Sequence, residues 1–306
     1  MAFEDSLRDL ADSEKRLTSQ QLISFGDLSV DERLAFADAW RDIEPSRRLR
    51  VLSDLTDLAE DNVELNFDAV FKIALDDEES EVRLAAIQGL YEYEGADLVP
   101  TLSMLLREDP DPEVRRESAV ALGRYALAAE FDKLDPRDAD AVREVLTECV
   151  EDVEEDEIVR ARALEALGAL SGEDTQNLIE SVYEEGDNLW LRVGAVDAMG
   201  RSCDEVWLPI VMRELENTAP QMRHAAAFAA GSIGDEMAVE PLMEMAANDP
   251  DTEVQRVAIA ALGEIGGRRA QVALRNLLLT GDDDLHDDIQ EALRNIEFGD
   301  DPLRVV

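Results

Sequence analysis

The sequence predicts an all-α protein, built as a solenoid of about seven stacked helix pairs with an N-terminal helical cap. Three observations lead to this prediction: a motif recurs at nearly constant spacing, apolar residues follow the period of a helix, and the composition favours helices. Of the 306 residues, 45% are hydrophobic but only 5% are aromatic. Alanine and leucine therefore supply the core, which favours closely packed helices over sheets.

The recurring motif starts with an apolar residue and usually Arg, continues through small residues, and ends at an apolar residue that Gly usually follows. Its seven copies begin at Val82, Val114, Val159, Leu191, Met222, Val254 and Leu285. Successive copies are 32, 45, 32, 31, 32 and 31 residues apart. A near-constant period indicates units that stack on their neighbours. The single long interval indicates an insertion near residues 128–138.

Each repeat contains the pattern of two helices joined by an acidic turn. In the copy that begins at Val254, small and apolar residues recur at i+4, i+7 and i+8, which is one face of a helix. The turn before it, like Asp109–Glu113, carries the Asp and Pro residues that end one helix and cap the next. The Gly after the second helix indicates either a helix C-terminus or a close helix crossing.

The run Asp109-Pro110-Asp111-Pro112-Glu113-Val114-Arg115, with its Ala-Leu-Gly ending at Gly123, resembles HEAT-like repeats of the short form named after phycobilisome lyases. The resemblance covers about residues 66–295 and implies a right-handed α-α superhelix. It divides the chain into a helical cap (1–65), a repeat solenoid (66–298) and a flexible tail (299–306). Three helices are expected in the cap. The last copy has His286 in place of Arg, as is typical of a repeat that ends a solenoid.

The charge is strongly acidic, with 72 acidic and 29 basic residues and a net charge of −43. This excludes nucleic acid and anionic membranes as partners and favours a protein with a basic surface. Scarce lysine beside abundant acid fits either a salt-loving host or a GC-rich genome. Cys149 and Cys203 lack a CxxC arrangement, and no leader or membrane span is visible. These features predict a cytoplasmic monomer.

The sequence predicts no catalytic site, metal or cofactor. Some HEAT-repeat hydroxylases hold two metal ions with His-Glu pairs in several repeats. Here His224 precedes Ala225 and His286 precedes Asp287, so the resemblance does not extend to that chemistry. The acidic runs 151–157 and 282–288 lack the spacing of a calcium loop. They are interpreted as solvated turns, with a weak divalent-cation site as the alternative.

An arginine recurs at the second position of the motif. This arginine ladder comprises Arg83, Arg115, Arg160, Arg192 and Arg223. One interpretation is a row of hooks for carboxylates or phosphates. The other is an internal ladder in which each guanidinium binds acids of the preceding turn, such as Asp109 or Asp187. Repetition at one position in every unit favours the internal ladder.

Other basic and aromatic residues form a candidate partner-binding surface. They are Arg124, Tyr125, Arg162, Arg201, Trp207, His224 and Phe228. The resemblance implies that second helices line the concave face, where such residues provide anchors for a partner. The alternative is pairing within the chain, with acids such as Glu117, Glu165 and Asp197.

These features together favour a non-catalytic protein–protein interaction scaffold that binds its partner on the concave face and is not an enzyme. Two alternatives stay open. The resemblance alone suggests a chromophore lyase or lyase-assisting protein, and the charge suggests an acidic assembly chaperone for a basic client. A bound bilin would identify the first, and salt-sensitive association with a basic protein would identify the second.

Overall fold

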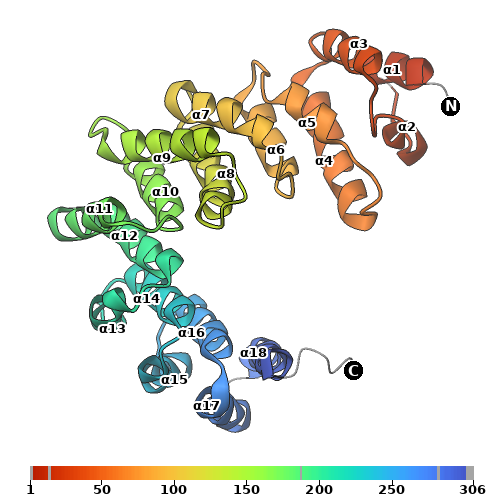
Figure 1. Cartoon of the computed structure of the whole chain (residues 1–306). Coiled ribbons are helices and arrows are strands. Elements are labelled where there is room, and N and C mark those ends of the chain that lie inside the picture. Colours follow the sequence, from red (N-terminus) through yellow and green to blue (C-terminus); the bar gives the residue numbers. More distant parts are fainter. Residues whose placement is uncertain (1–2, 13–14, 187, 281–282, 301–306) are drawn as a thin grey trace. The chain divides into compact units, whose positions relative to one another are not determined.

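The computed structural model describes residues 3–12, 15–186, 188–280 and 283–300, and it confirms the all-α prediction (Figure 1). These residues form 18 α-helices and four short 3-10 helices, and they contain no strand. The chain divides within helix α8 into two compact units, Met1–Tyr125 and Ala126–Val306. No helix in the described ranges is long and apolar enough to cross a membrane.

The first unit consists of short helices that pair along the chain. Its elements are α1 (Phe3–Ala11), α2 (Ser19–Ile23), α3 (Val30–Trp40), α4 (Pro45–Asp61), α5 (Asp68–Ala74), α6 (Ser80–Gly89), η1 (Ala96–Leu98), α7 (Val99–Glu108) and most of α8 (Pro112–Glu130). Residues 1–65 contain four α-helices rather than the expected three. A capping box at Thr18 starts α2 as a separate helix.

The second unit continues the alternation of first and second helices. Its elements after α8 are α9 (Pro136–Glu151), α10 (Glu157–Leu167), α11 (Glu173–Glu185), α12 (Leu189–Ser202), η2 (Glu205–Trp207), α13 (Leu208–Glu214), α14 (Pro220–Ile233), η3 (Glu236–Ala238), α15 (Val239–Asn248), α16 (Thr252–Ile265), α17 (Gly267–Thr280), η4 (Asp283–Leu285) and α18 (His286–Asp300). The expected tail begins within α18, and its residues 301–306 lie outside the described residues.

The insertion near residues 128–138 lengthens a second helix. Helix α8 runs for 19 residues to Glu130. Asp135 then accepts a hydrogen bond from the Arg137 backbone N–H, and Pro136 occupies the first turn of α9. The extra residues are therefore absorbed by one more stretch of helix and a turn.

Consecutive second helices in the second unit approach so closely that their contact points require glycine. A Cβ atom on Gly194 would lie 2.7 Å from the carbonyl oxygen of Ala161. One on Gly200 would lie 2.7 Å from the Cα of Ala229, and Gly231 meets Ala261 in the same way. The sequence left two roles open for the Gly that follows each second helix, a helix C-terminus or a close helix crossing. Gly200 and Gly231 lie at close crossings.

Two arginines of the ladder hold buried carboxylates. Arg83 donates from Nε and Nη2 to the two carboxylate oxygens of Asp109, both at 2.7 Å. Arg223 binds Asp249 at 2.7 and 2.8 Å in the same bidentate geometry. Each acid lies in the turn of the following repeat, not the preceding one. The preceding turn contributes carbonyl oxygens, such as that of Asp77 to Arg83 at 2.7 Å.

The same arrangement reaches into the expected cap. Arg48, on α4, lies 3.3 Å from the carboxylate of Asp77, and both side chains are buried. Trp40 donates its indole N–H to the same carboxylate at 2.7 Å. Asp77 therefore joins α3 and α4 to the turn that precedes the first motif copy.

The other ladder arginines make different contacts. Arg115 donates to the carbonyl oxygen of Asp109 at 2.7 Å, and Arg160 donates to that of Val150 at 2.9 Å. Arg192 lies 3.6 Å from the Glu214 carboxylate. All five arginines contact other residues of the same chain. We predict that these contacts stabilise the fold, which the substitution of Arg83 below tests.

Substitution of Gly200 by Ala should destabilise the protein. Alanine is the better helix former by ~1 kcal/mol, but its methyl group would collide with the α14 backbone and push the helices apart. We expect the free energy of unfolding to fall by ~1–3 kcal/mol in chemical denaturation. Ala260→Leu, which enlarges an exposed position on α16, is the control. A Gly200→Ala variant that is more stable than the unsubstituted protein would contradict this prediction. It would mean that α12 and α14 can move apart without loss of stability.

Substitution of Arg83 by Leu should be more costly, because it leaves the Asp109 carboxylate buried and without its cation. The Arg83 and Asp109 side chains are only 9% and 2% exposed. Removal of one partner of such a pair costs ~3–5 kcal/mol. Arg116→Leu, which breaks a partly exposed pair with Glu113 on the same face of α8, should cost under ~1 kcal/mol. Equal melting temperatures for the two variants would contradict a structural role.

Candidate functional site

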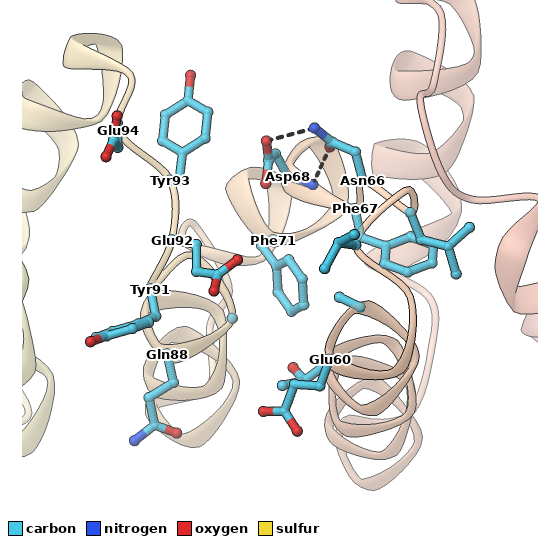
Figure 2. Close-up of a pocket in the computed structure, with 15 residues that line it drawn as sticks. Glu60, Asn66, Phe67, Asp68, Phe71, Gln88, Tyr91, Glu92, Tyr93 and Glu94 are labelled. Carbon is cyan, nitrogen blue, oxygen red and sulfur yellow. Dashed lines mark hydrogen bonds between the residues drawn. The ribbon is translucent and has the colours of Figure 1, made fainter. Parts of the chain in front are cut away.

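A pocket of about 480 Å³ lies between helices α4, α5 and α6 of the first unit (Figure 2). Helix α4 contributes one wall, α6 and the segment after it contribute the other, and α5 forms the floor. The lining residues are Thr56, Ala59, Glu60, Val63, Leu65, Asn66, Phe67, Asp68, Phe71, Gln88, Gly89, Tyr91, Glu92, Tyr93 and Glu94. All of them belong to a single compact unit.

The floor of the pocket is apolar. Phe67 and Phe71 are each only 2% exposed. The Phe71 ring packs against Gly89 so closely that a Cβ atom there would lie 2.2 Å from the ring. Because Gly89 has no side chain, the Phe71 ring can occupy the space next to the α6 backbone.

The rim of the pocket is acidic and has no compensating base. Four carboxylates line it, and none of the lining residues is Lys, Arg or His. In Figure 2, Glu60 on α4 and Glu92 after α6 lie on two sides of Phe71. Asp68 accepts a hydrogen bond from the Asn66 amide at 2.9 Å. Uncompensated negative charge above an apolar floor favours a ligand that is cationic at one end and aliphatic elsewhere.

One of the protein's own amines is bound beside this pocket. Lys72 Nζ lies 3.7 Å from the centroid of the Tyr93 ring and 2.8 Å from the Asp97 carboxylate. Burial of the amine acts to lower the pKa of Lys72, but its hydrogen bonds to Asp97 and Tyr93 outweigh this and raise it. The ring face and the carboxylate both attract the ammonium group, so this part of the chain already binds a cation.

A second group of functional side chains, the charged cluster, lies on second helices of the other unit. It consists of Arg162 and Glu165 on α10, Asp197 and Arg201 on α12, and Phe228 on α14. Glu165 is 2.5 Å from Arg162 and 3.0 Å from Arg201. The Arg201 guanidinium lies 5.5 Å from the Phe228 ring centroid. The positive charges of this cluster are therefore largely matched by carboxylates.

Asp197 is the perturbed group of the charged cluster. Its side chain is 14% exposed, and its nearest cation, Arg162, is 3.7 Å away. Burial, together with the neighbouring Glu165 charge, raises the pKa of Asp197 to about 7, against the smaller opposing effects of Arg162 and Arg201. A carboxyl group of this kind changes charge near neutral pH.

The structure brings together only some of the residues expected at a partner-binding surface. Arg162, Arg201 and Phe228 belong to the charged cluster, and His224 is exposed on α14. Two expectations are corrected. Tyr125 and Trp207 are 2% and 4% exposed, because their rings fill the core between helices.

Arg124 also differs from expectation, because it contacts its own chain. It is half-buried, and it donates from Nη1 to the carbonyl oxygen of Tyr91 at 2.9 Å. The pocket residues Glu60, Phe71 and Glu92 were not identified from the sequence. The run Tyr91-Glu92-Tyr93-Glu94, which replaces the usual Gly after Leu90, is the signal that marks this repeat.

The described residues do not fit a histidine–carboxylate metal centre of the kind that the resemblance associates with hydroxylases. His224 and His286 lie on α14 and α18. Within the described part of the chain, no three His, Cys, Asp or Glu side chains are arranged to hold a metal ion. No chemical step is therefore assigned to a metal here.

Comparison with known proteins identifies the repeats. The family model described as HEAT repeats matches residues 67–156 and 208–294, more than half of the chain. This chain belongs to the HEAT-repeat family. It is 25% identical over 207 residues to a Candida albicans protein named deoxyhypusine hydroxylase, a match that covers 61% of this chain and 64% of that protein. The HEAT-repeat chain thus spans just under two thirds of that curated relative.

Solved structures share the fold of this HEAT-repeat protein. The complex of CpcE and CpcF of phycocyanin lyase from Nostoc sp. PCC7120 matches with a TM-score of 0.52 and 18% identity, over 94% of this chain and 97% of that one. A chain of the Kap95p–RanGDP structure matches with a TM-score of 0.53 and 15% identity, over 98% of this chain and 46% of that one. At these identities the likeness is one of fold.

The curated relative overturns the functional prediction. A non-catalytic scaffold that binds its partner on the concave face, and the accompanying prediction that the protein is not an enzyme, are contradicted because the relative is a hydroxylase. The prediction failed because a repeat motif encodes helix packing, which enzymes and binding proteins of this fold share. The likeness to phycocyanin lyase is a likeness of fold and does not support the chromophore-lyase alternative.

The raised pKa of Asp197 predicts a pH-dependent contribution to stability. In the unfolded chain, the pKa of Asp197 is near the ordinary aspartate value of 3.8. Between about pH 4 and 7 the folded state therefore binds a proton that the unfolded state does not. Stability from this group therefore falls as pH rises through that window. Asp197→Asn should raise the free energy of unfolding by ~2–3 kcal/mol more at about pH 8 than at about pH 5.

Chemical denaturation of both proteins at the two pH values measures this difference. Glu180→Gln, at an exposed position on α11, is the control and should show no such pH dependence. An equal effect of Asp197→Asn at both pH values would mean that the carboxyl group titrates normally.

Proposed function

We propose that this chain is a hydroxylase-related HEAT-repeat protein whose pocket in the first unit binds an amine-bearing side chain of a protein substrate. One observation carries the proposal: four carboxylates surround an apolar floor, with no basic residue among the lining side chains. The name of the curated relative supplies the substrate class, since it acts on deoxyhypusine.

Deoxyhypusine is an amino acid with a long aliphatic side chain that contains amines. Such a chain needs apolar surface for its methylene groups and carboxylates for its charged nitrogens. Phe67 and Phe71 close the floor, and the exposed Val63 and Tyr91 side chains in the pocket lining supply most of the apolar surface, worth ~0.8 kcal/mol for each buried methylene group. Glu60 and Glu92, on two sides of the floor (Figure 2), supply the charge. The volume of about 480 Å³ suits a ligand of this size.

The charge of the whole chain supports a basic protein as the substrate. A net charge of −43 attracts positively charged partners over distance and speeds their association at low salt. The pocket then selects among the side chains that such a partner presents. A basic protein partner therefore remains part of the proposal.

The proposal concerns substrate binding. The described residues do not supply the histidine–carboxylate ligands of a di-metal hydroxylase, and no oxidation step is built on them. What the geometry supports is recognition of an ammonium group by Glu60 and Glu92, with the aliphatic part of the side chain over Phe71.

Calorimetric titration with three peptides tests the proposal. The peptides differ at one position, which carries deoxyhypusine, lysine or norleucine. We expect affinity to fall from deoxyhypusine to lysine to norleucine. The lysine side chain has one amine fewer than deoxyhypusine, and norleucine has no charged group. Glu92→Gln should weaken binding of the deoxyhypusine peptide about ten-fold, since a charge-assisted hydrogen bond contributes ~1.5–3 kcal/mol.

Glu81→Gln is the matched control, since it removes the same charge from an exposed position on α6 that does not line the pocket. Equal losses for the two variants would mean that only the overall charge matters. Equal binding of the deoxyhypusine and norleucine peptides would exclude an amine site.

A further inference from the structure

The segment Tyr91–Gly95, here called the pocket loop, joins α6 to η1 and contributes four residues to the pocket lining. Its own backbone provides little support. Tyr91 N–H donates to the Gln88 carbonyl at 3.1 Å, and Tyr93 N–H donates to the Leu90 carbonyl at 3.0 Å. The Gly95 carbonyl accepts from the Leu98 N–H at 3.2 Å, at the start of the next helix. Carbonyl groups that face inward from such a loop need donors from another element.

Two adjacent residues in the second half of α8 supply donors to this loop. Arg124 Nη1 donates to the Tyr91 carbonyl at 2.9 Å. The Tyr125 hydroxyl lies 3.2 Å from the carbonyls of both Tyr93 and Gly95. Three of the five loop carbonyls are thus contacted by two adjacent residues of one helix, within the first unit.

We propose that Arg124 and Tyr125 are positioning residues that hold the pocket loop in the conformation that binds the amine-bearing side chain. They act through the backbone of the loop, which carries Glu92 into the pocket lining beside Phe71 (Figure 2). The effect on ligand binding rests on the proposed function. The positioning of the loop rests only on the hydrogen bonds from α8.

Arg124 is poorly explained as a stabilising residue. Its Nε and Nη2 are buried and have no hydrogen-bond partner among the described residues. A buried donor without a partner costs free energy, which offsets part of what the side chain gains from its bond to Tyr91 and from its guanidinium group 5.2 Å from the Tyr125 ring centroid. A residue that gains so little stability is typical of a functional position.

Tyr125 is suited to act as a permanent donor. Its side chain is buried, and burial raises the pKa of its hydroxyl group, so that the group stays protonated. The side chain of Tyr93, whose carbonyl is one of the two acceptors, is held independently of Tyr125. Its hydroxyl donates to Asp97 at 2.5 Å, and the Lys72 amine lies over its ring. Replacement of Tyr125 by Phe therefore removes the α8 contact to two carbonyls and keeps the ring in the core.

The test combines backbone hydrogen exchange of residues 91–95 with titration of the deoxyhypusine peptide. Arg124→Met and Tyr125→Phe should each accelerate exchange in the pocket loop about ten-fold and weaken peptide binding about five-fold. The melting temperature should change by less than ~2 °C. Arg116→Met, on the same helix but paired with Glu113, is the control and should leave loop exchange and affinity unchanged.

The two measurements separate this inference from the proposed function. If the unsubstituted protein does not bind the peptide, the proposed function fails, while faster exchange confined to the loop in both variants still supports positioning. Unchanged loop exchange in both variants overturns the positioning role, whatever the peptide does. Equal losses of affinity in the variants and in Arg116→Met also overturn it.

Discussion

The close approach of consecutive second helices is the constraint on which the structure depends. In the second unit, Gly194, Gly200 and Gly231 receive the backbone or methyl group of an alanine on the neighbouring helix. Small residues at these points bring the helices into contact and leave no room between them. In the first unit, Gly89 receives the Phe71 ring from α5 instead. The pocket lies next to that ring, so a different contact partner for this glycine accompanies a hollow.

Charge distinguishes the two candidate sites more clearly than residue type does. In the charged cluster of the second unit, Glu165 lies close to both Arg162 and Arg201, so the chain satisfies its own cations. The pocket of the first unit has the opposite balance, with carboxylates and no base in its lining. In a protein with so large an excess of acid, basic residues attract attention in the sequence. The absence of basic residues from the pocket lining is the more informative feature.

The buried arginines explain why a strongly acidic chain can keep carboxylates in its interior. Asp77, Asp109 and Asp249 are each held by an arginine of the preceding repeat. Asp197 has no such bidentate partner, and burial raises its pKa to about 7. For Asp249, burial acts to raise the pKa, but the hydrogen bonds and charge of Arg223, with the backbone N–H of Asp251, outweigh it and lower the pKa. Asp197 has only more distant guanidinium groups, and its pKa rises.

The sequence by itself determined the helix pairs, their period and the absence of His-Glu pairs, because these depend on residue spacing along one chain. The period also located the insertion and the arginine that recurs in five of the seven motif copies. Only the tertiary structure decided what each side chain meets. It buried Tyr125 and Trp207, paired Arg83 with an acid 26 residues later, and placed Glu60, Phe71 and Glu92 around one hollow. Helical periodicity specifies which face of a helix is buried, whereas the neighbour that covers this face depends on packing between repeats.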